Sequence, residues 1–120
     1  MIAEKLAKLT VQTSYSKIPE EAVEKAKLCF LDFLGVALRG SQGESSKKVR
    51  NILPPCEESS ILGAGKSTTL DASLANGVAA HSMDLDDGHR IAQLHPGCCV
   101  IPAALATCES RKKDGKDLTT

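Results

Sequence analysis

The stretch LCFLDFLGVAL, residues 28–38, decides how this chain folds, because it is apolar on almost every side of a helix. It continues a helix that should begin at Pro19 and end before Gly40. The first half of that helix, EEAVEKAK, keeps a charged face, so only the second half should enter a core or an interface. Asp32 interrupts the apolar run, and we expect its carboxylate to be a buried, hydrogen-bonded structural acid.

Apolar spacing predicts helices along most of the remaining chain, which places it in the all-α class. Residues 56–67 are the exception, where we expect a loop with one short strand or turn around Ser60 to Leu62. The helix after this loop is rich in Ala, Ser and Gly and should lie in the interior. Besides the helix that contains residues 28–38, the predicted helices run from Ile2 to about Thr13, from Glu44 to Leu53, from Thr68 or Thr69 towards Gly88 (the helix after the loop), and from Pro102 to before Asp114.

Composition is that of one globular domain, with 42% apolar and 25% charged residues among 120. Fifteen basic residues balance fifteen acidic ones, so no strong field attracts nucleic acid or an anionic membrane. The longest apolar run, residues 28–38, is too short to cross a bilayer. Five cysteines with no CxxC pair, two of them adjacent at Cys98 and Cys99, indicate reduced thiols. We therefore expect a soluble cytoplasmic protein.

The stretch HSMDLDDGHRIAQLHPGCC, residues 81–99, holds all three histidines of the chain. If the helix that precedes it persists to Asp87, then His81, Asp84 and Asp87 lie on one face. Three acids in four residues repel one another, and the end of a helix is unfavourable for negative charge. A placement that conflicts with local preference in this way is typical of a functional site.

The spacing of these residues argues against several binding sites. An EF-hand would need its glycine one residue later than Gly88 and a closing glutamate. The run ILGAGKST resembles the end of a phosphate-binding loop, but Ser60 stands where the first glycine belongs. A transition-metal site remains an alternative because the residue types are suitable ligands, although their spacing matches no metal motif. Its ligands would come from His81, Asp84, Asp87, His89 and His95.

A metal-free acid/base site fits the same residues. Such a site needs a carboxylate and an imidazole, one taking a proton from the substrate and the other delivering one. Asp84 with His95 or His89 supplies both groups, and the forked donors of Arg90 suit a substrate carboxylate. We expect no metal at this site.

Longer motifs carry a resemblance to a known family. The run NGVAAHSMDLDDGHRIAQLHPGCCVIPAALATCE, residues 76–109, resembles the signature of the MmgE/PrpD family: N-G, then H-x-x-D-x-D-D, then H-P-[SG], then I-P-A-A-L-A and a glutamate. KAKLCFLDFLGVALRG, residues 25–40, is similar to the family's early helix with its embedded aspartate and closing glycine. ILGAGKSTTLDASLANG is similar to its glycine turn and motif helix. The resemblance covers about residues 3–118.

The resemblance implies a fold and a class of chemistry. Family members have a large all-helical domain and a smaller α+β lid, usually form homodimers, and place the active site between the two domains. Residues 1–120 would be the N-terminal part of the helical domain without the lid, and a homo-oligomer is expected. The family includes 2-methylcitrate dehydratase of propionate catabolism, cis-aconitate decarboxylase and iminodisuccinate epimerase. These enzymes act on small polycarboxylates without a metal or an organic cofactor.

Site residues carry over by position. In the decarboxylase branch the first aspartate of D-x-D-D and the histidine of H-P belong to the active site, which implies catalytic roles for Asp84 and His95. A threonine of that branch falls on Gly88, and the loop up to His95 is one residue longer here, which weighs against decarboxylation. His89 would then take the polar role of that threonine. Substrate binding is assigned to His89, Arg90 and Asp87.

The expected function is therefore that of a lyase resembling 2-methylcitrate dehydratase, which transfers protons by acid/base chemistry without a cofactor. The alternatives within the family are a cis-aconitate decarboxylase and an epimerase. The alternative of another class is a helical interaction module without catalysis. Since the family's lid and its remaining active-site histidine and lysine would lie beyond residue 120, we expect these residues alone to be inactive and to self-associate.

Overall fold

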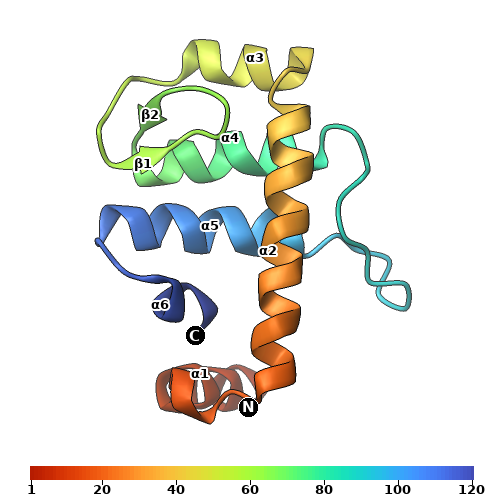
Figure 1. The fold of residues 1–120 in the computed structure, drawn as a ribbon, viewed down its shortest axis with the longest axis vertical. Helices are drawn as coiled ribbons and strands as arrows, with labels where there is room; N and C mark the ends of the chain where they lie inside the picture. Colours follow the sequence, from red (N-terminus) through yellow and green to blue (C-terminus); the bar gives the residue numbers. More distant parts are fainter.

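The computed structural model describes all 120 residues and is mainly helical, which confirms the predicted class (Figure 1). A two-stranded antiparallel hairpin lies near residues 60–67, as expected, and pairs Ser59 with Ser67 and Ser60 with Lys66. The elements are α1 (Ile2–Gln12), a 3-10 turn η1 (Tyr15–Lys17), α2 (Glu20–Gly40), α3 (Glu44–Ile52), β1 (Ser59–Ser60), β2 (Lys66–Ser67), α4 (Thr69–His81), α5 (Gly97–Ser110) and α6 (Gly115–Thr119).

Helices α4 and α5 lie side by side, and α2 crosses them both (Figure 1). Helix α3 packs against α4, and the hairpin contacts both α4 and α5, with the Ser59 hydroxyl donating to the Ala106 carbonyl of α5 at 2.7 Å. The predicted start of α4 is confirmed: Thr68 caps the helix, because its hydroxyl accepts a hydrogen bond from the backbone N–H of Asp71 at 3.2 Å. This arrangement makes α4 the central element of the fold.

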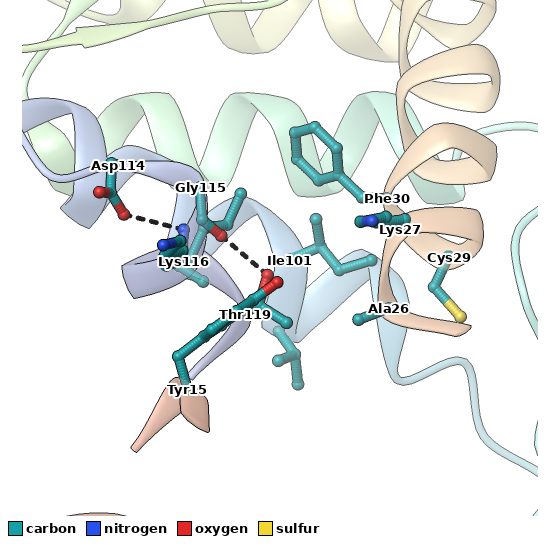
Figure 2. A pocket seen from close by; sticks show the side chains of 13 residues that line it. Tyr15, Ala26, Lys27, Cys29, Phe30, Ile101, Asp114, Gly115, Lys116 and Thr119 are labelled. Atoms are coloured by element: carbon teal, nitrogen blue, oxygen red, sulfur yellow. Dashed lines mark hydrogen bonds between the residues drawn. The ribbon is translucent and has the colours of Figure 1, made fainter. Parts of the chain in front are cut away.

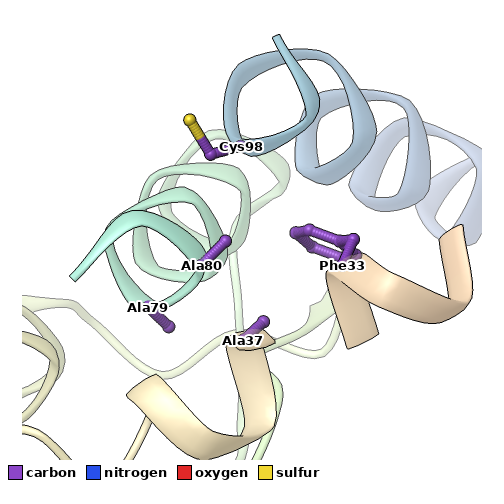
Figure 3. Packing of buried hydrophobic residues seen from close by; sticks show 5 residues of the cluster. All are labelled: Phe33, Ala37, Ala79, Ala80 and Cys98. Carbon is purple, nitrogen blue, oxygen red and sulfur yellow. The ribbon is translucent and has the colours of Figure 1, made fainter. Parts of the chain in front are cut away.

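Small side chains form the core where these helices meet. Phe33 and Ala37 of α2 pack with Ala79 and Ala80 of α4 and with Cys98 of α5 (Figure 3). A second cluster joins α4 to the hairpin loop and α5 through Ile61, Ala72, Ala75 and Ala106. Alanine lets helices approach closely, so the predicted interior position of α4 is confirmed by its buried alanines.

Gly40 marks the closest approach of α2 to α4. A Cβ built on Gly40 would overlap the carbonyl oxygen of Ala79, so no larger residue fits there without a shift of a helix. The same end of α2 is tied to α3, because the Ser46 hydroxyl donates to the Gly40 carbonyl at 2.8 Å. The glycine that ends the predicted helix is therefore also a packing residue.

Asn76 fastens the hairpin loop to α4. Its side chain is fully buried, its Oδ1 accepts from the Leu62 N–H at 2.8 Å, and its Nδ2 donates to the Ser60 carbonyl at 2.9 Å. Gly63 makes the turn between the two strands with a φ of 73°, a conformation that glycine adopts without strain. The glycine turn predicted from the sequence thus leads into α4 as expected.

Two predicted helix boundaries were wrong. Helix α4 ends at His81 and does not reach Asp87, so the residues that follow form a loop. Helix α5 begins at Gly97, and Pro102 lies inside it. Proline at this position removes the N–H that would bond to the Cys98 carbonyl, and that carbonyl instead lies against Gly77 of α4.

The prediction that Asp32 is buried was also wrong, because one face of α2 is uncovered. Asp32 is exposed, and Leu28 and Leu31 beside it keep 60% and 66% of their surface. Only the face with Phe33 and Ala37 enters the core. Helix α1 has no buried residue at all. None of the helices has both the length and the apolar character needed to span a membrane.

Two glycines of α2 provide a matched test of the helix contact. Gly40→Ala should lower the free energy of unfolding by roughly 1–3 kcal/mol, because α2 and α4 must move apart. Gly35→Ala should raise it by up to about 1 kcal/mol, since nothing lies within 4 Å of the added Cβ and alanine favours a helix. Urea unfolding followed by circular dichroism measures both, and equal midpoints would contradict the predicted contact.

Candidate active site

The loop between α4 and α5 brings the two ends of the motif together. It doubles back on itself, with the His89 N–H donating to the Leu94 carbonyl at 2.8 Å and the Gln93 N–H to the His89 carbonyl at 2.8 Å. His81 closes α4 and His95 lies two residues before the start of α5, and their ring centroids lie 5.0 Å apart. The antiparallel packing of α4 and α5 thus creates a pair of facing imidazoles (Figure 1).

Asp86 lies between the two imidazoles. Each of its carboxylate oxygens is 3.1 Å from His81 Nδ1, and its Oδ1 is 3.4 Å from His95 Nδ1. Only 3% of its side chain is exposed. Asp84 approaches the other nitrogen of the same ring, with Oδ1 3.6 Å from His95 Nε2 and its side chain 80% exposed. His95 therefore has a carboxylate at each ring nitrogen.

Asp86 stays ionised in spite of its enclosure. Burial by itself would raise the pKa of its carboxyl group, but hydrogen bonds from His81 and Cys98 outweigh burial and hold this pKa below its usual value. The negative charge is thus available to both histidines at neutral pH. A permanent anion between two imidazoles favours rings that carry a proton on the facing nitrogen.

The structure brings three of the predicted site residues to one hollow. His89, Arg90 and His95 line a cavity of about 290 Å³ on the loop, together with Gly88, Gln93 and Leu94. His89 is partly engaged, because its Nδ1 accepts from the Ala92 N–H at 3.1 Å. Asp84 lies next to this group through its contact with His95. The backbone φ of Asp84 is 54°, in the left-handed region.

Asp87 is turned towards the start of α5. Its Oδ1 accepts a hydrogen bond from the Gly97 N–H at 2.9 Å, one of the unpaired donors at the N-terminus of a helix. A Cβ on Gly97 would overlap this carboxylate, so the loop is held tightly at that point. Asp87 therefore fixes the end of the loop next to His95.

Sequence reasoning missed Asp86. It assumed that α4 continues to Asp87, which puts His81, Asp84 and Asp87 on one face and turns Asp86 away. Because the helix ends at His81, the loop returns instead and Asp86 points between the histidines. The sequence did contain one signal for Asp86: it is adjacent to Asp87, and two neighbouring side chains of a loop usually point in different directions.

The cluster offers ligand types that a metal could use, but its side chains form a chain of carboxylate–imidazole contacts from His81 through Asp86 and His95 to Asp84. One ligand atom from each of His81, Asp84, Asp86 and His95 can be found within 4.8 Å of the others. A tetrahedral ion with bonds of about 2.0–2.2 Å needs its ligands about 3.4 Å apart around one centre. His95 instead meets Asp86 through Nδ1 and Asp84 through Nε2, in different directions. This geometry suits proton transfer better than a shared ion.

A larger cavity lies outside the cluster. It has a volume of about 700 Å³, lies among α2, α5, α6 and η1, and is lined mainly by apolar side chains such as Phe30, Ile101 and Leu118 (Figure 2). None of the histidines or loop aspartates lines it. Lys27 and Lys116 are its cations. It is larger than the loop hollow, but it lacks an acid–base pair of the kind found there.

Comparison with known proteins matches this chain to one family. Residues 4–120 match the profile of the MmgE/PrpD N-terminal domain, which is nearly the whole chain. The chain belongs to the MmgE/PrpD family. This confirms the resemblance drawn from the motifs.

Curated relatives of this MmgE/PrpD chain are fungal. A cis-aconitate decarboxylase of Aspergillus terreus is 30% identical over 109 residues, which is 85% of this chain and 22% of that protein. The cis-aconitate decarboxylase-like protein oryM of Aspergillus oryzae is 29% identical over 102 residues, which is 82% of this chain and 21% of that protein. The chain thus spans about a fifth of the length of these relatives. No solved structure gives a significant match.

Adjacent cysteines beside the cluster should differ in reactivity. Cys98 is buried. Burial, and to a smaller extent the neighbouring Asp86 carboxylate, raises the pKa of its thiol to about 12. Cys99 is exposed. Because the thiolate is the nucleophile, iodoacetamide at mildly alkaline pH should alkylate Cys99 and spare Cys98, and both should react in urea. Tandem mass spectrometry locates the label, and equal labelling in the native protein would contradict the buried position of Cys98.

Proposed function

We propose that the protein is a lyase of the MmgE/PrpD family that acts on a small polycarboxylate by acid/base proton transfer, without a metal or organic cofactor. The observation that carries the proposal is the pairing of Asp84 Oδ1 with His95 Nε2 at 3.6 Å, next to the hollow that His89 and Arg90 line. A carboxylate and an imidazole beside a cationic side chain are the groups that proton transfer next to a carboxylate requires.

Each side chain has a role in this proposal. His95 Nε2 and Asp84 exchange protons with the reacting carbon and with the leaving group. Arg90 binds a substrate carboxylate through its forked donors, and His89 binds a second polar group of the substrate. Asp87 uses Oδ1 on Gly97 and keeps Oδ2 for a substrate hydroxyl. The exposure of Asp84 leaves its carboxylate accessible to a molecule in the hollow.

The relatives make cis-aconitate the first substrate to test, since their names state that activity. Decarboxylation requires delivery of a proton to the carbon that loses carbon dioxide, and dehydration requires removal of a carbon proton and protonation of the departing hydroxyl. The same acid–base pair serves both reactions. 2-Methylcitrate is the second substrate and iminodisuccinate, through epimerisation, the third. Because Gly88 stands where the decarboxylase branch has a threonine, His89 supplies the polar group on this side of the hollow.

A non-catalytic interaction module is the competing proposal, favoured by the uncovered face of α2 with Leu28 and Leu31. The same face supports a homo-oligomer, because an apolar surface of this kind is usually covered in a soluble protein. All five cysteines are free, which supports a reducing compartment such as the cytoplasm. Turnover of a polycarboxylate by the protein would decide for the enzyme.

Asp84→Asn tests the proposed acid–base pair. In the full-length polypeptide that carries these residues, this isosteric change should lower kcat on the preferred substrate by about 10²- to 10⁴-fold, because the amide cannot exchange the proton. Its exposed position predicts an unchanged melting temperature. Glu57→Gln, at a side chain near the hairpin that is 92% exposed and outside both the loop and the uncovered face of α2, is the matched charge-removing control and should keep full activity.

The assay is performed after dialysis against a chelator, and the wild-type rate should survive this treatment if no metal takes part. Full activity of Asp84→Asn would remove this aspartate from the mechanism. A wild-type protein that turns over none of the three substrates would favour the interaction module.

A further inference from the structure

Asp86 differs from the other acids of the loop in its surroundings. Its side chain is 3% exposed, whereas that of Asp84 is 80% exposed. The groups that face it come from three elements: His81 from α4, His95 from the loop, and Cys98 from α5. No lysine or arginine is among them. An enclosed carboxylate whose main partners are two imidazoles is placed to act on those imidazoles.

The same nitrogen of each ring faces this carboxylate. Nδ1 of His81 is 3.1 Å from both oxygens, and Nδ1 of His95 is 3.4 Å from Oδ1. An ionised carboxylate only accepts hydrogen bonds, so Asp86 favours a hydrogen on Nδ1 of each neutral ring. At His95, Asp84 competes from Nε2 at 3.6 Å, but its carboxylate is 80% exposed and solvated, whereas Asp86 is nearer and enclosed, so Nδ1–H is the favoured form. Nε2 then carries the lone pair in both rings. This is the form in which Nε2 can take a proton from a substrate.

The contact to His95 is the weaker of the two and has room to close. His95 Nδ1 is buried and has no partner within hydrogen-bonding geometry. An unpaired buried N–H is costly, and Asp86 Oδ1 at 3.4 Å is the carboxylate oxygen that faces this atom. We expect the ring to reorient towards this oxygen when Nδ1 carries the hydrogen, because the separation is already only 3.4 Å. A proton gained at Nε2 makes the ring cationic and strengthens this contact further.

We propose that Asp86 is the positioning residue of the site: it fixes the tautomer and the orientation of His81 and His95 through their Nδ1 atoms, and so presents both Nε2 atoms as proton acceptors. For His95 this inference rests on the proposed function, since it gives the acid–base histidine its active form opposite Asp84. For His81 it adds a second proton-carrying group to the site, at the end of α4.

A purely structural role for Asp86 is the alternative. In that case it links the end of α4 to the start of α5, and its loss destabilises the loop without changing the protonation pattern of the rings. The two roles are separated by measurements that report on the ring nitrogens directly. Stability and activity alone do not separate them.

The test uses the full-length protein labelled with ¹⁵N in its histidine rings. In the wild type, at a pH where the rings are neutral, NMR should show His81 and His95 in the Nδ1–H form. Asp86→Asn is isosteric, but it removes the charge and replaces one of the two oxygens that lie 3.1 Å from His81 Nδ1 with an NH₂ group, which donates and cannot accept. One histidine should therefore shift towards the Nε2–H form, and Asp32→Asn should leave both rings unchanged.

Kinetics supply the second measurement. Asp86→Asn should lower kcat by between about 10-fold and 10⁴-fold, as when an orienting carboxylate is removed, with a smaller change in KM. The pH at which the rate is half-maximal should also move, because His81, His95, Asp84 and Cys98 all face the lost charge or its partners. Asp86→Glu, which restores the charge, should recover part of kcat and of the pH profile.

Several outcomes would overturn the inference. One is an Nε2–H form of His95 in the wild type, which needs no variant and holds even if Asp86→Asn does not fold. Another is a folded Asp86→Asn variant with unchanged tautomers and an unchanged pH profile. The tautomer measurement needs no substrate, so it stands apart from the proposed function. Absence of turnover by the wild type would defeat that function and leave the tautomer result readable.

Discussion

The contact between Gly40 and the carbonyl of Ala79 is the constraint on which the rest of the structure depends. It brings α2 directly against α4, and the neighbouring alanines let α5 pack closely beside α4 in the same core cluster (Figure 3). Because these side chains are small, the distances between helix axes are set by backbone contact more than by side-chain shape. The position of α5 relative to α4 follows from this packing.

That relative position determines the site. The C-terminus of α4 and the N-terminus of α5 lie beside each other, and the chain between them has to leave and return over a short distance (Figure 1). Asp87 secures the return by accepting from the Gly97 N–H, and the His89 backbone closes the outer part of the loop. The two histidines meet because they stand at the two ends of this loop, so the site is assembled by helix packing and not by one regular element.

Much of the fold could be predicted from sequence patterns, because the features that determine it are local. The cap at Thr68, the turn at Gly63 and the interior character of the alanine-rich helix follow from the properties of single residues. The start of α5 could not be read in this way, because tolerance of Pro102 inside the helix depends on a glycine of another helix. The exposure of Asp32 likewise depends on what covers α2, which a local pattern does not contain. For the site, the motif indicated Asp84 and His95, whereas Asp86 required knowledge of the path of the loop.

The backbone of Asp84 has a consequence for how this site can vary. Its φ of 54° lies in a region that costs most residues about 1 kcal/mol or more, and that aspartate, asparagine and glycine tolerate best. Glycine would relax the loop but remove the carboxylate, and asparagine would keep the backbone and lose the charge. Of the three residues that this backbone conformation tolerates best, only aspartate carries a carboxylate. Under the proposed role of Asp84, an aspartate here exchanges some stability of the loop for chemistry, and drift towards a more stable protein would tend to lose the acid first.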